Sequence, residues 1–330
     1  MKKSTTYSIL LLGTLLTAAC AKEATEDSTA AAERRVTSWI SVYHPDAQRT
    51  EGDIWILDET PGTGDEWDVE NKGLAYVTVT TRDLDGTITA TNDEAVARQI
   101  GSWTNTGYYG PSMWFVAAGG MAEGYAAVLE GMRIGGTRQA LLPSWTLSSS
   151  SSHMLMDIRL DYQSDNVLDY QVDRLKEFSA RYMENEDSTY YNGTDGDRFG
   201  FYYHTLRPGE ILEEMPSDTT VYVNYTGRRL DGVVFDTTIA DTAKFYGIYD
   251  SSNTYEPIPV YWASSYENIT ITSSKSDAVD GFQMMLWHMH PGEKAIGAFY
   301  SSLGYGSSGT GSAIPSYAPL SFTIEMVEEP

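Results

Sequence analysis

The segment 278–329 constrains the fold more than any other part of the sequence, because four local patterns follow one another there. Apolar side chains recur at helical spacing at Val279, Phe282, Met285, Leu286 and Met289. Pro291-Gly292 then ends the helix, since proline cannot continue one and glycine turns freely. Residues 294–300 and 320–327 alternate as strands do. The segment therefore predicts a helix, a strand, a glycine- and serine-rich loop around Tyr305, and a closing strand.

A second informative run covers residues 221–238 and reads as a strand, a turn at Asp231-Gly232 and a strand ending in Phe235-Asp236. In order, the two runs contain YTG, DG and FD, then GF, PGEKA, the YG loop, and an AIP…APLSFTIEM ending. This ordered set resembles the FKBP-type peptidyl-prolyl isomerases over residues 200–329. The resemblance implies an antiparallel, curved β-sheet wrapped on a short α-helix.

The pattern occurs a second time, in a more divergent form, at residues 52–163, so the chain contains an internal duplication. This copy has a strand at 75–81, a turn at Asp85-Gly86, a strand–helix–strand segment at 113–147 and a closing strand at 154–162. We therefore predict an α+β fold with two FKBP-like domains.

The first copy lacks the residues that the resemblance links to activity. Val79 stands at the position of the tyrosine, Thr89-Ala90 replaces the Phe-Asp pair, and the serine run 148–152 replaces the YG loop, whereas Tyr125 keeps an aromatic ring at the helix. We expect this copy to fold but not to catalyse.

The domain organisation follows from these segments. We predict a signal peptide at 1–20, a flexible tether at 21–35, the degenerate domain at 36–164, a linker helix and loop at 165–199, and the isomerase domain at 200–330.

The first twenty residues have the pattern of a secretory signal, with two lysines before an apolar run that is too short to span a bilayer. Cys20 ends this pattern and is the only cysteine, which is typical of a bacterial lipoprotein with a lipid on that residue. The alternative is an ordinary signal peptide with Cys20 incidental. We predict an outer-membrane lipoprotein of the cell envelope, facing either the periplasm or the surface.

The net charge of −24 excludes some partners. So acidic a protein does not follow a phosphate backbone and is repelled by anionic lipid, so we expect no nucleic acid and a membrane contact through the acyl anchor alone. Proline-containing polypeptides are the partners that the resemblance implies.

Rotation about an X–Pro bond is slow because amide resonance raises a barrier of about 18–20 kcal/mol. The twisted amide has less charge separation than the planar forms, so a dry apolar pocket favours it. This chemistry needs no cofactor and no metal, and we predict neither. His288 and His290 with Glu293 resemble a metal site only superficially, since side chains two apart on a helix diverge.

The resemblance assigns roles residue by residue. Tyr225 and Phe235 are the side walls, and Asp236 lies at the polar edge. Val279 offers its backbone N–H, Phe282 is the floor, and Tyr305 donates its hydroxyl to a substrate carbonyl. The remaining lining residues are Ile258, Ala278, Ile314 and Phe322. Each of these residues, taken singly, is also explained as core, strand packing or a turn.

Three departures from the family pattern leave alternatives open. Phe282 stands where many members have tryptophan, Thr310 stands where a histidine often contacts macrolides, and residues 237–278 form a long insert rich in tyrosine. The insert could be a flap or a chaperone-like surface. The competing hypotheses are a peptide-binding module without turnover and an envelope lipoprotein that binds glycans through exposed aromatic side chains.

Overall fold

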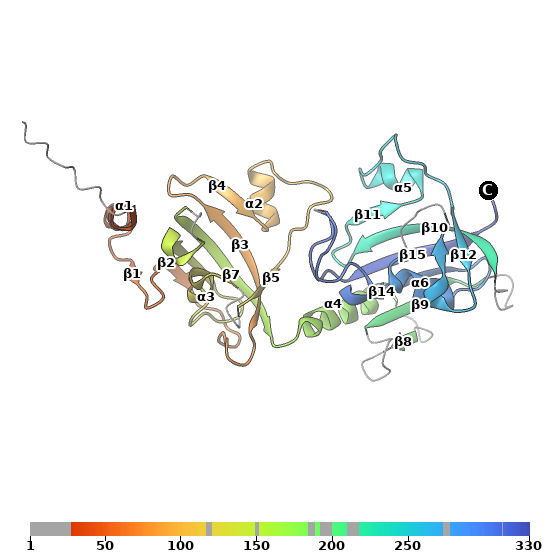
Figure 1. Cartoon of the computed structure of the whole chain (residues 1–330), viewed down its shortest axis with the longest axis horizontal. Coiled ribbons are helices and arrows are strands. Elements are labelled where there is room, and N and C mark those ends of the chain that lie inside the picture. Colours follow the sequence, from red (N-terminus) through yellow and green to blue (C-terminus); the bar gives the residue numbers. More distant parts are fainter. Residues whose placement is uncertain are drawn as a thin grey trace, which may run out of the picture.

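Each half of the chain forms one antiparallel sheet, and the two sheets lie side by side along the long axis of the molecule (Figure 1). The computed structural model describes residues 28–116, 121–148, 152–183, 189–191, 200–209, 218–272, 278–311 and 313–330. The predicted α+β class with two FKBP-like domains is confirmed, since both sheets are antiparallel and carry few helices.

The sheet of the first domain joins its strands in an order that is not their order in the chain. The order is β1 (Gln48–Arg49), β2 (Trp55–Thr60), β6 (Thr137–Leu142), β7 (Met154–Ser164), β3 (Leu74–Arg82) and β4 (Ile88–Thr91), with β5 (Ser112–Phe115) also on β3. The helices are α1 (Ser28–Tyr43), α2 (Glu94–Gln99) and α3 (Glu123–Ala127), and Ser144–Thr146 is a 3₁₀ turn.

The sheet of the second domain follows the same plan. Its order is β13 (Thr270–Ile271), β12 (Ile258–Trp262), β10 (Thr219–Arg229), β15 (Leu320–Val327), β14 (Lys294–Phe299), β9 (Phe201–Arg207) and β8 (Thr189–Tyr191), with β11 (Val234–Thr237) also on β10. The helices are α4 (Val167–Tyr182), α5 (Ala240–Phe245) and α6 (Asp280–His288), and 3₁₀ turns cover Tyr266–Asn268 and Ser301–Leu303.

Alternation along the strands gives each sheet two apolar faces. In β14, Ala295 and Phe299 belong to the core under α6, whereas Ile296 and Ala298 pack with α4 on the opposite face. The first domain is similar, because Leu141 packs with α1 while its neighbours Ala140 and Leu142 join the inner core. Each sheet is therefore covered by a short inner helix and a longer outer helix.

The outer helices correct two of the predicted boundaries. The predicted tether 21–35 is helical from Ser28, because the apolar side chains of α1, among them Val36 and Ile40, pack against Trp55 and Leu141. Residues 21–27 and Cys20 lie outside the described residues. The predicted linker helix is present as α4, but Leu175 and Phe178 pack on the second sheet. The loop predicted at 185–197 contains β8, which pairs with β9. Helix and strand therefore belong to the second domain.

Corresponding elements from β3 to β5 in the first domain and from β10 to β12 in the second are separated by a constant distance in the chain. Glu94 and Gln99 bound α2, and Ala240 and Phe245 bound α5, so both bounds are 146 residues apart. The same separation relates the β3–β5 pairs, such as Leu74↔Phe115, to the β10–β12 pairs, such as Thr220↔Tyr261. The predicted duplication thus extends to individual strand registers.

The predicted insert at 237–278 is not an addition to the second domain alone. It contains α5 and β12, and the first domain has α2 and β5 at the matching positions. Even single contacts repeat: Thr104 N donates to the Tyr109 hydroxyl at 2.9 Å, and Asp250 N donates to the Tyr255 hydroxyl at 2.9 Å. Only the part around Tyr266–Asn268 and β13 has no counterpart among the described elements of the first domain.

Helices long and apolar enough to cross a membrane are absent from the described part of the chain.

Candidate functional site

Four aromatic side chains from four elements of the second domain converge on one point of the inner core. They are Tyr225 on β10, Phe235 on β11, Phe282 on α6 and Phe322 on β15. The ring centroids are 5.5 Å apart for Tyr225–Phe282, 5.2 Å for Phe282–Phe322 and 5.7 Å for Phe235–Phe322, all with edge-to-face geometry. This geometry is a favoured one for aromatic pairs.

A glycine makes room for this cluster. Gly227 pairs with Phe322 on one side of β10 and with Asp236 on the other. A Cβ atom at Gly227 would lie 2.7 Å from the Phe235 ring and 2.9 Å from the Phe322 ring. Both distances are too short for real atoms, so the glycine of the YTG sequence leaves the space that the ring packing needs.

The polar edge of the cluster is a tyrosine–aspartate pair. The Tyr225 hydroxyl donates to Asp236 Oδ2 at 2.5 Å. Burial first, and then the charge of Asp236, raise the pKa of Tyr225, so this hydroxyl keeps its proton. The contact holds the carboxylate beside the rings.

Tyr305 reaches the same region from the loop after β14 and is 38% exposed. Burial and then the charge of Asp236 raise the pKa of Tyr305, so this side chain too lies within electrostatic range of the carboxylate. Tyr305 N–H and C=O also belong to a compact loop, since Gly309 N donates to the Tyr305 carbonyl. Two tyrosine side chains thus lie within electrostatic range of one carboxylate at the edge of the apolar cluster.

The other predicted residues surround these groups. Ile258 on β12, Ala278 and Val279 pack partly buried against the core, and Val279 caps the N-terminus of α6. Ile314 is buried, and it closes a short β-bridge with Thr310. The structure thus brings together all ten residues predicted for the site in one core cluster or at its edge.

The first domain has no such cluster at the matching positions. Val79 and Thr89 replace Tyr225 and Phe235, and Met156 opposes Thr81 as Phe322 opposes Gly227. The Thr81 and Thr89 hydroxyl groups bond to each other at 2.8 Å in place of the glycine–phenylalanine packing. Tyr125 is present but contacts Trp114. The first domain therefore lacks the converging rings, and Val79, Met156, Trp114 and Tyr125 pack in its core instead.

The histidine–glutamate group has a structural role. Buried Glu293 accepts hydrogen bonds from the Tyr203 hydroxyl at 2.6 Å, the Thr205 hydroxyl at 2.6 Å and His290 N at 2.8 Å. Groups of three or more side chains able to hold a metal ion do not occur among the described residues. These bonds anchor the turn after α6 to β9.

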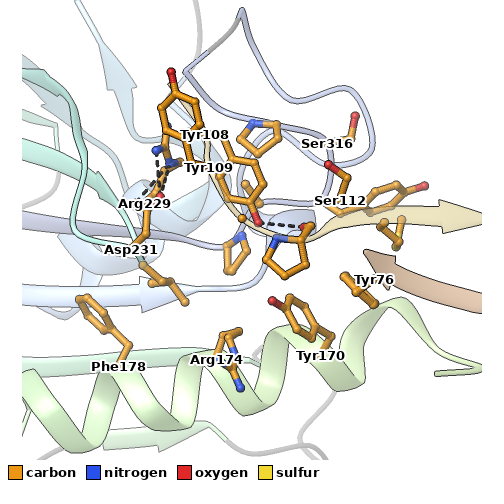
Figure 2. Close-up of a pocket in the computed structure, with 18 of the residues that line it drawn as sticks. Tyr76, Tyr108, Tyr109, Ser112, Tyr170, Arg174, Phe178, Arg229, Asp231 and Ser316 are labelled. Atoms are coloured by element: carbon orange, nitrogen blue, oxygen red, sulfur yellow. Dashed lines mark hydrogen bonds and ion pairs between the residues drawn. The ribbon is translucent and has the colours of Figure 1, made fainter. Parts of the chain in front are cut away.

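A hollow lies between the two domains, and none of the four clustered rings lines it. It has a volume of about 1060 Å³ and is lined by Tyr76 and Tyr108 of the first domain, Tyr170 and Arg174 of α4, and Arg229 of the second domain (Figure 2). Sequence reasoning missed it because its walls come from five segments, and sequence patterns do not show that segments so far apart meet. The aromatic cluster remains the candidate active site, because the Tyr225–Asp236 pair lies there beside the converging rings.

Comparison with known proteins agrees with this geometry. Residues 213–327 match the family model for the FKBP-type peptidyl-prolyl cis-trans isomerase. The second domain belongs to the FKBP family. A search of curated proteins found no match.

Solved structures of FKBP-type proteins are similar to this chain at low identity. The three FKBP domains of wheat FKBP73 are 17% identical over 84% of this chain and 95% of that chain, with a TM-score of 0.31. A peptidyl-prolyl isomerase of Pseudomonas syringae pv. tomato is 21% identical over 50% and 97%, and FkpA of Escherichia coli is 22% identical over 49% and 62%, both with TM-scores of 0.31. The family assignment rests on the match at 213–327.

Proposed function

We propose that this FKBP protein is a peptidyl-prolyl cis–trans isomerase and folding helper whose activity resides in the second domain. The observation that carries the proposal is the convergence of Tyr225, Phe235, Phe282 and Phe322 beside the Asp236 carboxylate. The matching positions of the first domain lack these rings, so we assign no activity to it.

The mechanism depends on the low polarity around the amide, and no covalent bond is formed or broken. A proline ring seated over Phe282 and between Tyr225 and Phe235 leaves its amide in a surrounding of low polarity. The planar amide, with its larger charge separation, loses solvation there, while the twisted amide loses less. Each 1.4 kcal/mol of this difference accelerates rotation about tenfold.

Polar groups at the edge hold the chain on either side of the twisting bond. Tyr305 donates its hydroxyl to a peptide carbonyl, and the Val279 N–H at the start of α6 offers a second donor. Asp236 accepts a hydrogen bond from Tyr225 and orients that hydroxyl. These contacts fix one part of the peptide while the proline side rotates.

Isomerisation of an X–Pro peptide by the full chain tests the proposal. Asp236→Ala with Tyr305→Phe should lower kcat/KM at least about tenfold, because both edge groups are lost. Asp241→Ala is the matched control, since this carboxylate on α5 has a side chain 94% exposed and pairs only with Lys244. Equal rates for the double variant and the wild type would refute the site.

Exposed aromatic side chains favour a second candidate, a peptide-binding surface without turnover. Phe245 is 82% exposed, and Tyr246 and Tyr249 are also exposed on α5 and the turn after it. Clusters of this kind mark binding sites more often than chance surface. Peptide binding without rate enhancement would select this candidate, and glycan binding lost on Phe245→Ser and Tyr249→Ser would select a glycan-binding protein.

We also propose that Cys20 carries a lipid that anchors the protein in the cell envelope, in the outer membrane, where its partners are proline-containing polypeptides. The support is the sequence pattern around Cys20 and the acidic charge, which makes attachment by basic residues ineffective. Mass spectrometry of the mature N-terminus tests this. A Cys20→Ser variant that still fractionates with the membrane would refute it.

A further inference from the structure

Arg229 is a buried cation that binds both domains at once. Its side chain is 3% exposed and pairs with Asp231 at 2.9 Å. The guanidinium also donates to the carbonyl oxygens of Thr106 at 2.8 Å and Gly107 at 2.7 Å, which belong to the first domain. Figure 2 shows Arg229 beside Asp231 and Tyr108 at one end of the interdomain hollow.

The third set of partners lies in the loop of the candidate active site. Arg229 Nη1 donates to the carbonyl of Ala313, between Thr310 and Ile314. Thr310 N donates to the Ile314 carbonyl at 2.8 Å. Arg229 therefore binds the turn that the Thr310–Ile314 bridge closes. Ile314 is one of the lining residues of the aromatic site, and Tyr305 lies in the same loop.

Two further contacts tie the first domain to this region. Asn105 Nδ2 donates to the carbonyls of Tyr246 at 2.9 Å and Gly247 at 2.8 Å, at the end of α5. The Phe115 ring lies 5.8 Å from the ring of Tyr317, a residue with a positive φ of 58°. A bulky residue seldom adopts this φ, so its conformation depends on surrounding contacts.

We propose that the first domain acts as an intramolecular clamp that, through Arg229, fixes the loop 304–318 in the conformation that presents Tyr305 and Ile314 to substrate. Arg229 is a positioning residue, because it acts through the loop and contacts no reacting atom. The expected change in isomerisation kinetics rests on the proposed function. The expected change in the loop rests on the contacts alone. It gives a role to a domain whose own site has lost its rings.

The physical basis is the cost of separating this guanidinium from its acceptors. A buried cation with a missing partner is strongly unfavourable, so docking of residues 106 and 107 and closure of the loop stabilise each other. Without the first domain's carbonyls, the loop loses a fixed point and visits open conformations in which Tyr305 is misplaced. Coupling of this kind changes local opening more than global unfolding.

The test uses the full chain with hydrogen exchange and proline-isomerisation kinetics. Arg229→Met should raise amide exchange at Thr310, Ile314 and Tyr317 at least about tenfold, since these amides are bonded within the loop or to it. It should also lower kcat/KM at least about fivefold, mainly through KM, because Tyr305 acts in binding. Arg229→Lys should give intermediate values in both measurements.

Arg138→Met is the matched control. Arg138 is a second buried arginine, 4% exposed, which donates to the carbonyls of Val128 and Glu130 and pairs with Glu59 inside the first domain. Its loss should lower global stability as Arg229→Met does, yet leave exchange in 304–318 and KM unchanged. Equal effects of the two variants on the loop would overturn the proposal, because they would reduce it to general destabilisation.

Asn105→Ala tests the first domain's part without touching Arg229. It should raise exchange in the loop by a smaller factor than Arg229→Met. Unchanged exchange in Asn105→Ala and Arg229→Lys would also overturn the clamp, even if Arg229→Met failed to fold. Absence of isomerisation by the wild type would refute the proposed function, whereas the exchange rates would still decide on the clamp.

Discussion

In both domains, hydrogen bonds join corresponding strands, β3 and β10, to the residue that follows the next strand. Aromatic rings cluster beside this contact in the second domain. In the first, Asn92 bonds in both directions with the backbone of Val79, and Thr80 bonds to Thr91. In the second, Thr238 bonds in both directions with the backbone of Tyr225, and Thr226 bonds to Thr237. The first domain therefore keeps these backbone contacts without the cluster of aromatic rings.

The difference is confined to a few side chains that contribute little to the strand pairing. In the second domain the Phe235 ring packs against Gly227. At the matching positions of the first domain, the Thr89 and Thr81 hydroxyl groups bond to each other. Both strand pairs have a bulge at the same place. Stability and activity are thus separable at these positions, and the following experiments test that separation.

The largest effect is expected from giving the second domain the residues of the first. Tyr225→Val with Phe235→Thr and Asp236→Ala should reduce kcat/KM by about a hundredfold or more, or about 2.7 kcal/mol of transition-state stabilisation. Two walls and the edge carboxylate are lost. Proline-isomerisation kinetics measure this, with circular dichroism to check that the sheet remains.

The reverse exchange is its control. Val79→Tyr with Thr89→Phe and Ala90→Asp should not confer activity on the first domain, because Thr81 leaves no room for the ring and the described part of this domain has no loop like the one that bears Tyr305. Activity gained by this variant in an Asp236→Ala background would contradict the comparison.

The next largest effect, a loss of stability of the second domain, is expected from Glu293→Ala. This carboxylate is buried in the second domain, whereas Gly136 stands at the matching place in the first, between Gly135 and β6. Removing it leaves the Tyr203 and Thr205 hydroxyl groups without their acceptor and should cost about 3 kcal/mol. Urea unfolding followed by Trp262 and Trp287 fluorescence should show the second domain unfolding first; simultaneous unfolding of both domains would argue against independent cores.

Alkaline pH should weaken both domains alike. Burial raises the pKa of Tyr76 and Tyr108 in the first domain and, with help from nearby carboxylates, of Tyr203 and Tyr225 in the second. A raised folded pKa favours the protonated form, so this stability is fully present below the unfolded value near 10 and is lost as pH rises above it, by up to about 1.4 kcal/mol per unit and tyrosine. Denaturant midpoints from pH 7 to 11 check this.

The same shifts predict that Tyr225 does not titrate in the activity profile. The tyrosine contribution to kcat/KM should be flat between about pH 6 and 9, well below the ordinary tyrosine pKa of about 10. A step in that range that disappears in Tyr225→Phe would contradict the assignment of Tyr225 as a protonated donor to Asp236.

The smallest effect is expected from Val79→Ala. Val79 packs partly buried against the first core, so its truncation should cost about 1 kcal/mol of stability. Isomerase activity should stay at the wild-type level, in contrast to Tyr225→Ala at the equivalent position. A drop in activity without a change in the loop 304–318 would place part of the function in the first domain.

Local patterns were sufficient to predict most strands, the helix α6 and the turn at Asp231-Gly232, because alternation and turn chemistry are properties of short segments. The ten residues predicted for the site came from the order of motifs, and the structure places them in one core cluster or at its edge; their roles stay predictions. The segment α4 was assigned as a linker because amphipathicity shows that a helix has an apolar face, but not which sheet covers it.

The sequence does not predict long-range contacts, because local patterns do not show which distant segments meet. Arg229 reads as one more charged residue before a turn, and its partners at 106, 107 and 313 are carbonyl oxygens, which every residue has. The sequence does not reveal that the segment 237–278 has a counterpart in the first domain, because the two share strand register and helix bounds but few side chains.

The constant spacing of 146 residues also has a historical consequence. One segment contains α2 and β5 in the first domain, and the matching segment contains α5 and β12 in the second. This segment was therefore present before the ancestral gene was duplicated. The extra turn and β13 of the second domain are then a later change in one descendant, or a deletion in its sister. A present-day relative with a single unit and the α5-like helix would preserve the form from which both halves descend.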